Sequence, residues 1–435
     1  MLDPKLIRDN PDAVKQAATQ KRVASPEQVD AWLAADDKRR KAQTEADTVR
    51  AEQGKIGGEV GKLKGKLKGQ PNTPELDALL AKAGELKAKY EAAVAAQTDA
   101  EAAANAIMLQ LPAIPDPTWP VGKDADENVV VRTWAAPGRE AKPLASGQLD
   151  HIALGTKHGI LDFDRGVKIA GSRSYVLRGQ GALLYRAVLQ FALDVLVKRG
   201  WEPFVVPVLV TEQCMVGTGY FPAGRDQAYV TQDGSALVGT SEVPLASYYG
   251  AEILDEVQLP KKMCALSNCF RREAGAAGKD TAGLYRVHQF DKVEQVVVHK
   301  ADEAEHIALH EEIIANAEFL LKELGLAYRV VQNCTGDMGQ GKWRMYDIET
   351  WMPSRNAYGE THSGSALKDF QSRRLNLRYR KQGEKSPTFA YTLNNTAIAC
   401  PRVLIAILET YQNADGSITV PAALRPYMNG IEKIG

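Results

Sequence analysis

The sequence predicts an α+β protein in which helices flank an antiparallel β-sheet, and an antiparallel two-helix coiled coil precedes this body. Three observations support this fold class. Two apolar seams with steps of three and four residues lie near the start, strand-like and helical segments mix from about residue 121 onward, and neither common glycine-rich phosphate loop is present. We therefore expect a first domain over residues 1–111, a linker over 112–120 and a second domain over 121–435.

The composition is typical of a globular protein, with 44% hydrophobic and 25% charged residues. Lys+Arg and Asp+Glu both number 54, so a nucleic-acid partner would have to be met by a local basic patch. The five scattered cysteines argue against a disulfide framework and suit a reducing cytosol. The start, MLDPKLIRDN, lacks an apolar leader, and no apolar stretch approaches membrane-spanning length. We expect a cytoplasmic protein with no membrane partner.

The first elements are helices that begin at polar residues followed by proline. Asp3-Pro4, Asn10-Pro11 and Ser25-Pro26 each fit an N-cap with proline at the first helical position. Gln28 adds a capping box to Ser25. Three helix starts are therefore predicted within the first 26 residues.

Two apolar seams follow, over arms at 26–69 and 74–111 with a break at GQPNTPE. The first seam is interrupted by Arg39 and Gln53, and the second carries Gln97. Two such seams joined by a short turn predict an antiparallel two-helix coiled coil. An arm of about 40 residues would be roughly 60 Å long. Such an arm could contact a partner far from the second domain.

The end of this arm is unusual. GKIGGEVGKLKGKLKGQ contains six glycines, each of which weakens a helix by up to about 1 kcal/mol. It also contains a cluster of basic residues: Lys55, Lys62, Lys64, Lys66 and Lys68. A solubilising charged face is one interpretation. A pliable cationic end that contacts a phosphate backbone is the interpretation we favour, because the chain as a whole is neutral.

After the Pro-rich linker the pattern is mixed. Amphipathic helices are predicted at 179–199 and 301–325. Strands are predicted at 203–210, 286–298, 327–333, 343–351 and 388–394.

One group of charged residues falls on two predicted neighbouring strands within 270–294. Alternation places Arg286, His288, Phe290, Lys292 and Glu294 on one face of the second strand. Arg271 and Glu273 share a face of the preceding strand. A salt-bridged surface hairpin would explain these charges, and so would a site for a triphosphate beside an ammonium.

Three further segments carry polar side chains that could form a site. Glu360 and Ser363 could share a hard cation such as Mg²⁺, while the arginines that follow, through residue 380, could equally form a solvated basic strand. Arg402 begins a helix, where it opposes the helix dipole and so suggests a bound nucleotide. Thr240 and Glu242 share one side of a segment predicted to be extended.

Together these segments resemble the class II aminoacyl-tRNA synthetases. FRREAG with GLYRVHQFDKVE is similar to motif 2, NNTAIACPR to motif 3, and the helix at 179–199 leading to Val206-Pro207 to the dimer-forming motif 1. Within this class, T-x-E at 240–242, RVHQF, DFQSRR, ALRPYMNG and the coiled coil resemble the seryl-tRNA synthetase family. The resemblance spans essentially the whole chain and implies a class II antiparallel sheet.

The resemblance implies an ATP site and its chemistry. Arg271 would hold the α-phosphate, Phe290 would stack on adenine, and Arg402 would cover the opposite face. The implied catalytic residues are Arg271, Glu273 and Arg402. The implied ATP-binding residues are Arg271, Arg272, Glu273, Arg286, Val287, Phe290, Glu360, Thr361, His362, Ser363 and Arg402. Glu360 and Ser363 would be the metal ligands for Mg²⁺.

The resemblance also implies ATP-dependent activation of serine and its transfer to tRNA(Ser), with tRNA(Sec) left open. The implied serine-binding residues are Thr240, Ser241, Glu242, Arg271, Glu294, Asn394 and Thr396. The implied tRNA-binding residues are the five lysines at the end of the arm, Lys55, Lys62, Lys64, Lys66 and Lys68. A homodimer is expected.

Some features depart from the family pattern or leave alternatives open. His362 and Gly364 stand where the family usually has Ser and Cys. A catalytically silent RNA-binding paralog and an amino acid:carrier-protein ligase are the alternative functions. The loop 274–284 is expected to order over ATP or the tRNA acceptor end.

Overall fold

The computed structural model describes residues 1–275, 278 and 280–435. The loop expected to order over ATP includes Ala276, Ala277 and Lys279, which lie outside the described residues. The chain forms two compact units. The arm unit comprises Asp3–Thr19 and Val23–Leu111, and the body unit comprises Met1–Leu2, Gln20–Arg22 and Pro112–Gly435.

The arm unit is helical, as predicted, and all three predicted helix starts are confirmed. Its helices are α1 (Pro4–Asp9), α2 (Pro11–Lys21, of which the last two residues are assigned to the body unit), α3 (Pro26–Leu67) and α4 (Pro74–Met108). Asp3 caps α1 by accepting the Lys5 N–H at 2.8 Å. The Gln28 side chain accepts the Ser25 N–H at 2.8 Å, which forms one half of the predicted capping box.

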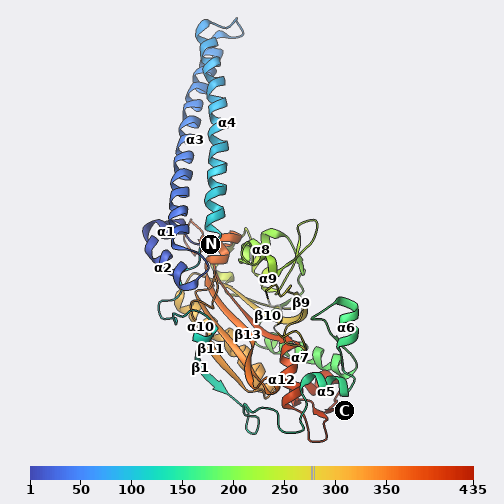
Figure 1. Ribbon diagram of the computed structural model, residues 1–435. Coiled ribbons are helices and arrows are strands. Elements are labelled where there is room, and N and C mark those ends of the chain that lie inside the picture. Colours follow the sequence, from blue (N-terminus) through green and yellow to red (C-terminus); the bar gives the residue numbers. More distant parts are fainter. Residues whose placement is uncertain (276–277, 279) are drawn as a thin grey trace. The chain divides into compact units, whose positions relative to one another are not determined.

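Helices α3 and α4 run side by side along their length (Figure 1). Apolar residues of both predicted seams are buried between them: Trp32, Ala46, Ile56, Leu76, Leu86, Ala93 and Ala104. The two-helix coiled coil is therefore confirmed, and its stability depends on this narrow apolar strip.

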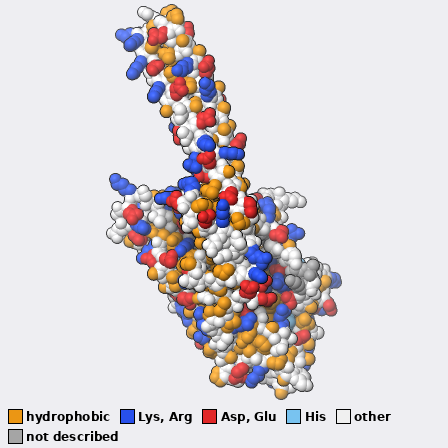
Figure 2. Space-filling view, turned by 60° about the vertical axis from the view of Figure 1, so that its left-hand side comes forward, with side chains coloured by type: hydrophobic (Ala, Val, Ile, Leu, Met, Phe, Trp, Pro, Cys, Tyr) orange, Lys and Arg blue, Asp and Glu red, His pale blue; other side chains and the backbone are white. Residues whose placement is uncertain are grey.

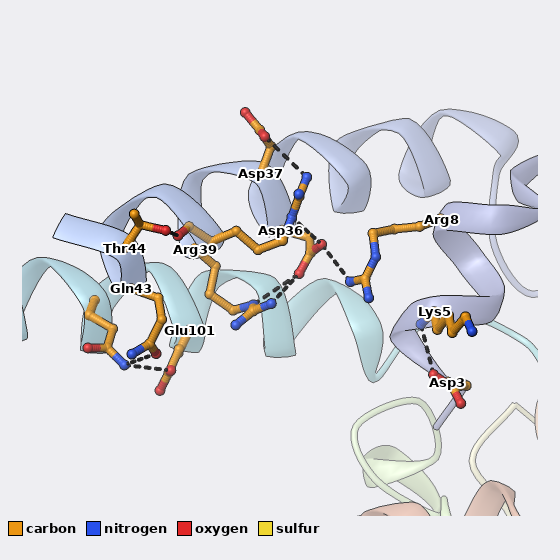
Figure 3. A network of polar contacts seen from close by, with 11 residues as sticks. Asp3, Lys5, Arg8, Asp36, Asp37, Arg39, Gln43, Thr44 and Glu101 are labelled. Carbon is orange, nitrogen blue, oxygen red and sulfur yellow. Dashed lines mark hydrogen bonds and ion pairs between the residues drawn. The ribbon is translucent and has the colours of Figure 1, made fainter. Parts of the chain in front are cut away.

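A buried carboxylate interrupts the α3 seam (Figure 3). The apolar spacing predicts Arg39 as the polar interruption, but Asp36 is the buried residue, with its side chain 2% exposed. Asp36 accepts hydrogen bonds from Arg39 at 2.8 and 2.9 Å and from Arg8 of α1 at 2.9 Å. Burial raises the pKa of Asp36, but the bonds from Arg39 and Arg8 more than offset this, so the pKa is lowered. The carboxylate thus ties α1 to α3.

The far end of the arm carries the predicted lysines on exposed positions, from Lys55 to Lys68. Figure 2 shows basic side chains (blue) projecting there among acidic ones (red). Five glycines of this end lie within α3, and a Cβ added at any of them would meet no atom within 4 Å: Gly54, Gly57, Gly58, Gly61 and Gly65. Their lack of side chains is therefore not required by packing.

The body unit is built on an eight-stranded sheet (Figure 1). In spatial order the strands are β1 (Val129–Trp134), β11 (Tyr328–Gln332), β12 (Arg344–Met352), β13 (Ala357–Lys368), β16 (Tyr391–Cys400), β10 (Gln289–His299), β9 (Lys261–Phe270) and β4 (Glu202–Phe204). Neighbouring strands are antiparallel except for β4 and β9, which are parallel. The predicted α+β class with a mainly antiparallel sheet is confirmed.

Several predicted strands differ in extent. The segment 203–210 splits into β4 and β5 (Leu209–Val210), which belong to different sheets and are separated by Pro207, a residue that cannot donate to a ladder. The segment 388–394 breaks between β15 (Thr388–Phe389) and β16. The region 359–380 is not one basic strand, because β13 is followed by α11 (Phe370–Leu375) and β14 (Arg378–Arg380).

The remaining elements complete the body unit. Its other helices are α5 (His151–Lys157), α6 (Phe163–Ala170), α7 (Gln180–Lys198), α8 (Glu212–Thr218), α9 (Glu242–Ser247), α10 (Glu303–Glu323) and α12 (Arg402–Thr410). The other strands are β2 (Leu161–Asp162), β3 (Val176–Leu177), β6 (Tyr229–Val230), β7 (Ala236–Leu237), β8 (Ile253–Asp255), β17 (Ile418–Thr419) and β18 (Lys433–Ile434).

Helices α7 and α10, both predicted from the sequence, pack against the sheet. In α7, Leu184, Val188 and Leu196 are at most 1% exposed and belong to the main core of the body unit. Within the described residues α7 is the one helix that is long and apolar enough to cross a membrane by length and composition, a test that core helices also pass. In this helix, 44% of the most apolar 18-residue stretch is buried.

Candidate active site

A cavity of about 660 Å³ lies over strands β10, β13 and β16. Most residues implied by the family resemblance line this one cavity. They are Glu242, Arg271, Glu273, Arg286, Val287, Phe290, Glu294, Glu360, Thr361, Ser363, Asn394, Thr396 and Arg402. Residues from six separate segments of the sequence therefore meet at one face of the sheet.

Strand β10 supplies the central row of the cavity. Phe290, Lys292 and Glu294 alternate along it and all line the cavity, as the sequence predicts. The predicted strand positions of Arg286 and His288 are wrong, because β10 begins at Gln289, and His288 does not line the cavity. The predicted strand positions of Arg271 and Glu273 are wrong, because β9 ends at Phe270 and both residues lie beyond it. Glu273 has a φ of 52°, so the backbone turns here instead of continuing in an extended conformation.

Glu294 is the carboxylate of the row and is buried, with its side chain 2% exposed. Lys292 Nζ lies 2.5 Å from Glu294 Oε2, and Thr396 donates to the same oxygen at 3.3 Å. Burial raises the pKa of Glu294, and Lys292 only partly offsets this effect. The carboxylate is therefore held in a water-poor place where a cation would be bound strongly.

Glu242 is held by three neutral donors. It is the first residue of α9, so the predicted extended conformation of this segment is wrong. Gln371 and Asn394 both donate to Glu242 Oε1 at 2.8 Å, and the Tyr220 hydroxyl donates to Oε2 at 2.7 Å. A carboxylate has about four acceptor positions, so one remains for a ligand. Burial, with the neighbouring Glu242, raises the pKa of Tyr220 well above its usual value.

Arginines line the part of the cavity away from Glu242 and Glu294. Arg286 pairs with Glu273 at 3.0 Å and lies 3.4 Å from Asp280. Arg402 donates to the Glu360 carbonyl at 2.5 Å and to the Tyr285 carbonyl at 3.2 Å. Its guanidinium also lies 4.3 Å from the centre of the Tyr285 ring. Such planar cations suit phosphate oxygens and the face of a base.

Arg271 joins these two parts of the cavity. Its guanidinium carbon lies 5.2 Å from the centre of the Phe290 ring, and its backbone carbonyl is 2.9 Å from His288 Nδ1. Arg271 therefore stands beside the aromatic ring and close to the row of charges on β10.

Glu360 and Ser363 lie on the cavity side of β13 and offer the oxygen ligands that Mg²⁺ prefers. Asp347 of β12 pairs in register with Ser363. Its Oδ1 is buried, and among the described residues it has no hydrogen-bond partner. Burial, followed by the charge of Glu360, raises the pKa of Asp347. This set of hard oxygens, with one carboxylate oxygen unsatisfied, fits a cation. No group of three or more His, Cys, Asp or Glu suited to a metal occurs among the residues described.

Four of the implied ATP- and serine-binding residues do not line the cavity. Arg272 is exposed, and its N–H donates to the Gln227 carbonyl. Ser241 is fully buried, with its hydroxyl 3.4 Å from the Ala265 carbonyl. Thr240 lies just before Ser241, the N-cap of α9, and its hydroxyl accepts the Glu242 N–H at 3.2 Å.

The fourth is His362. His362 does not line the cavity although Glu360, Thr361 and Ser363 do, and the pairing of β13 with β12 shifts register here, so simple alternation does not hold. It is 1% exposed, with Nδ1 2.8 Å from the Thr361 hydroxyl. Burial lowers the pKa of His362 to about 3, so the ring is neutral.

Sequence reasoning missed three residues that shape the cavity. Alternation places Lys292 on the correct face, but the sequence alone assigns it no role. Gln371 belongs to the DFQSRR segment, and no local pattern shows that it reaches Glu242. Tyr220 gives no sequence signal, because its partner is 22 residues away and the two are joined only by the fold.

Comparison with known proteins agrees with this geometry. Residues 1–115 match the family described as "Seryl-tRNA synthetase N-terminal domain", and residues 229–411 match "tRNA synthetase class II core domain (G, H, P, S and T)". The serine–tRNA ligase of Deinococcus radiodurans is 44% identical over 438 residues, which cover 100% of this chain and 99% of that protein.

Solved structures give the same result. The seryl-tRNA synthetase of Pyrococcus horikoshii, solved with ATP, aligns with a TM-score of 0.89 at 38% identity over 100% of this chain and 99% of that one. The cytoplasmic serine–tRNA ligase of Naegleria fowleri, solved with AMP, aligns with a TM-score of 0.84 at 31% identity over 100% and 98%. With full-length coverage in sequence and in structure, the chain belongs to the seryl-tRNA synthetase family.

Proposed function

We propose that the cavity activates serine with ATP to form seryl-adenylate and passes the seryl group to tRNA(Ser). The observation that carries this proposal is the row on β10, which places an aromatic ring, a buried ion pair and the neighbouring Arg271 along one cavity wall. The full-length relatives bear the name serine–tRNA ligase, which supports the same activity.

ATP would lie along the arginine side of the cavity. Phe290 would stack on the base, with Glu273 and the backbone of Val287 reading its edge. Arg271 would hold the α-phosphate and stabilise the charge that develops there during in-line attack. Arg286 and Arg402 would bind the terminal phosphates, exchanging their present carboxylate and carbonyl partners for phosphate oxygens.

Serine would lie at the other end of the row. Glu294 would bind its ammonium, because this buried carboxylate favours a cation. Glu242 would use its remaining acceptor position for the serine hydroxyl, with Thr396 and Asn394 beside it. A buried polar site of this kind rejects analogues without the hydroxyl more strongly than an apolar pocket could.

Glu360 and Ser363 would hold Mg²⁺, with the adjacent Asp347 as a further oxygen near the site. When bound, the ion would neutralise phosphate charge and orient the leaving pyrophosphate.

The arm unit would bind tRNA. The exposed lysines at its end, Lys55, Lys62, Lys64, Lys66 and Lys68, suit a phosphate backbone. RNA helices are read mainly by shape and backbone contacts, which a pliable cationic end can follow. Transfer to tRNA(Sec) would require the same contacts.

A second copy of the chain would pack against α6 and α7. Helix α7 is strongly apolar yet incompletely buried, and Val167 and Ile169 of α6 are 48% and 76% exposed. An exposed apolar patch on a protein surface often marks an interface. We therefore propose a homodimer, which light scattering after gel filtration would test. All five cysteines are free, which suits a cytoplasmic location.

ATP–pyrophosphate exchange with a panel of amino acids tests the activity. Exchange should depend on serine and be lost in Arg271→Ala. Preference for alanine or glycine would contradict the substrate, and serine exchange without tRNA charging would favour a ligase that loads a carrier protein. No exchange with any amino acid would indicate a catalytically silent RNA-binding paralog.

A further inference from the structure

Lys292 is a buried cation in the middle of the cavity. The proposed function assigns no group of the substrates to it. Its side chain is 7% exposed, and it lines the cavity from β10. Its Nζ lies 2.5 Å from Glu294 Oε2, the one ion-pair partner it has among the described residues. Because a buried ammonium is costly without a counterion, its position requires a reason.

The position of Lys292 along the strand suggests that reason. It lies two residues from Phe290 and two from Glu294 on the same face, which is roughly 6–7 Å from each. The row therefore places Lys292 midway between the proposed base site and the proposed ammonium site. In a bound serine and ATP, the serine carboxylate and the α-phosphorus lie between these two groups.

Charge balance leads to the same place. In this structure Lys292 pairs with Glu294. When the serine ammonium takes Glu294, Lys292 is left without its counterion, and an ammonium has three N–H donors to satisfy. The serine carboxylate arrives with the ammonium and carries the charge that is needed. One ion pair thus becomes a square of four alternating charges, with no net charge added to the buried site.

We propose that Lys292 binds the carboxylate of serine and orients it for attack on the α-phosphorus of ATP. This inference rests on the proposed function. One carboxylate oxygen forms a bond to the α-phosphorus, the bond from that phosphorus to the bridging oxygen of the β-phosphate breaks, and pyrophosphate leaves with the electron pair. Lys292 keeps its protons throughout, and Arg271 remains assigned to the phosphate.

The test compares two ligands in wild type and Lys292→Met by isothermal titration calorimetry. L-Serine carries a carboxylate, whereas 2-aminoethanol has the same hydroxyl and ammonium without one. In the variant, serine should bind about 10- to 100-fold more weakly, the range for a charge-assisted hydrogen bond. Binding of 2-aminoethanol should be unchanged or tighter, because the lysine that competes for Glu294 is gone. The affinity for ATP should not change.

A purely structural role for the ion pair predicts a different result. Both ligands would then weaken by the same factor in Lys292→Met, and that outcome overturns the inference, as does unchanged serine binding. Lys262→Met is the matched control, since it removes a Lys–Glu pair, to Glu312 at 2.7 Å, from outside the cavity. It should leave the ratio of the two affinities as in wild type.

Two further measurements separate the possible failures. If Lys292→Met does not fold, as judged by circular dichroism, Lys292→Gln replaces it, and the same ratio decides. If wild type itself shows no binding of serine and no serine-dependent exchange, the proposed function fails. If wild type is active but the ratio of serine affinity to 2-aminoethanol affinity is the same in the variant, the role of Lys292 is contradicted and the proposed function stands.

Discussion

Replacing Tyr220 with Phe removes one hydrogen-bond donor from the proposed serine selector and leaves the ring in place. The Tyr220 hydroxyl donates to Glu242 Oε2 at 2.7 Å, and Glu242 is 7% exposed. Hydrogen bonds to a charged group contribute about 1.5–3 kcal/mol, so we expect the free energy of unfolding to fall by this amount. Gln371 and Asn394 hold only Oε1, so the carboxylate also loses its fixed orientation.

The functional readout is the KM for serine in ATP–pyrophosphate exchange. It should rise about 10-fold, which corresponds to roughly 1.4 kcal/mol, while the KM for ATP stays unchanged. Tyr328→Phe is the matched control, because Tyr328 is 1% exposed and donates to Glu318 at 2.9 Å away from the cavity. It should cost similar stability without changing either KM. An unchanged serine KM in Tyr220→Phe, or equal changes in both variants, would refute the reasoning.

Three other predictions concern stability and tRNA. Burial lowers the pKa of His299 and His310 to about 4 and that of His306 well below 6.5, so the unfolded chain binds protons that the folded chain does not. Stability should therefore fall as the pH drops from about 6.5 toward 4, as urea unfolding at several pH values would show, and a flat profile would contradict this sign. Replacing Lys62, Lys64, Lys66 and Lys68 with Ala should weaken tRNA charging and flatten its salt dependence by about one unit of slope per lost contact, with serine activation intact. Asp36→Ala should destabilise the arm unit by about 1–3 kcal/mol, less than for a fully buried pair because its arginine partners are 30% or more exposed, and a thermal melt that does not move would exclude the proposed tie.

Local signals in the sequence were enough to predict the arm. Ser25 with Pro26 and Gln28 marks a helix start through contacts within four residues, and the seam steps repeat over many turns. The exception is Asp36, whose burial depends on Arg8 from another helix. A spacing rule cannot show that a carboxylate will find partners across two helices.

The site was only partly predictable for the same reason. The alternation of Phe290, Lys292 and Glu294 follows from strand geometry and could be inferred directly. The end of β9 at Phe270 and the start of α9 at Glu242 depend on backbone turns that alternation does not signal. Tyr220 and Gln371 reach Glu242 only once distant segments have folded together, so no motif in one sequence could reveal that contact.

The glycines within the end of α3 also matter for engineering the arm. Because an added methyl group at Gly54, Gly57, Gly58, Gly61 or Gly65 would touch nothing, alanine can replace each of them without repacking any neighbour. Each replacement should strengthen the helix by up to about 1 kcal/mol. The stiffness of the arm can therefore be adjusted in graded steps while the surface charges and the catalytic body stay constant. In a series of variants with one to five of these alanines, tRNA selection could be measured as a function of the stiffness of the arm.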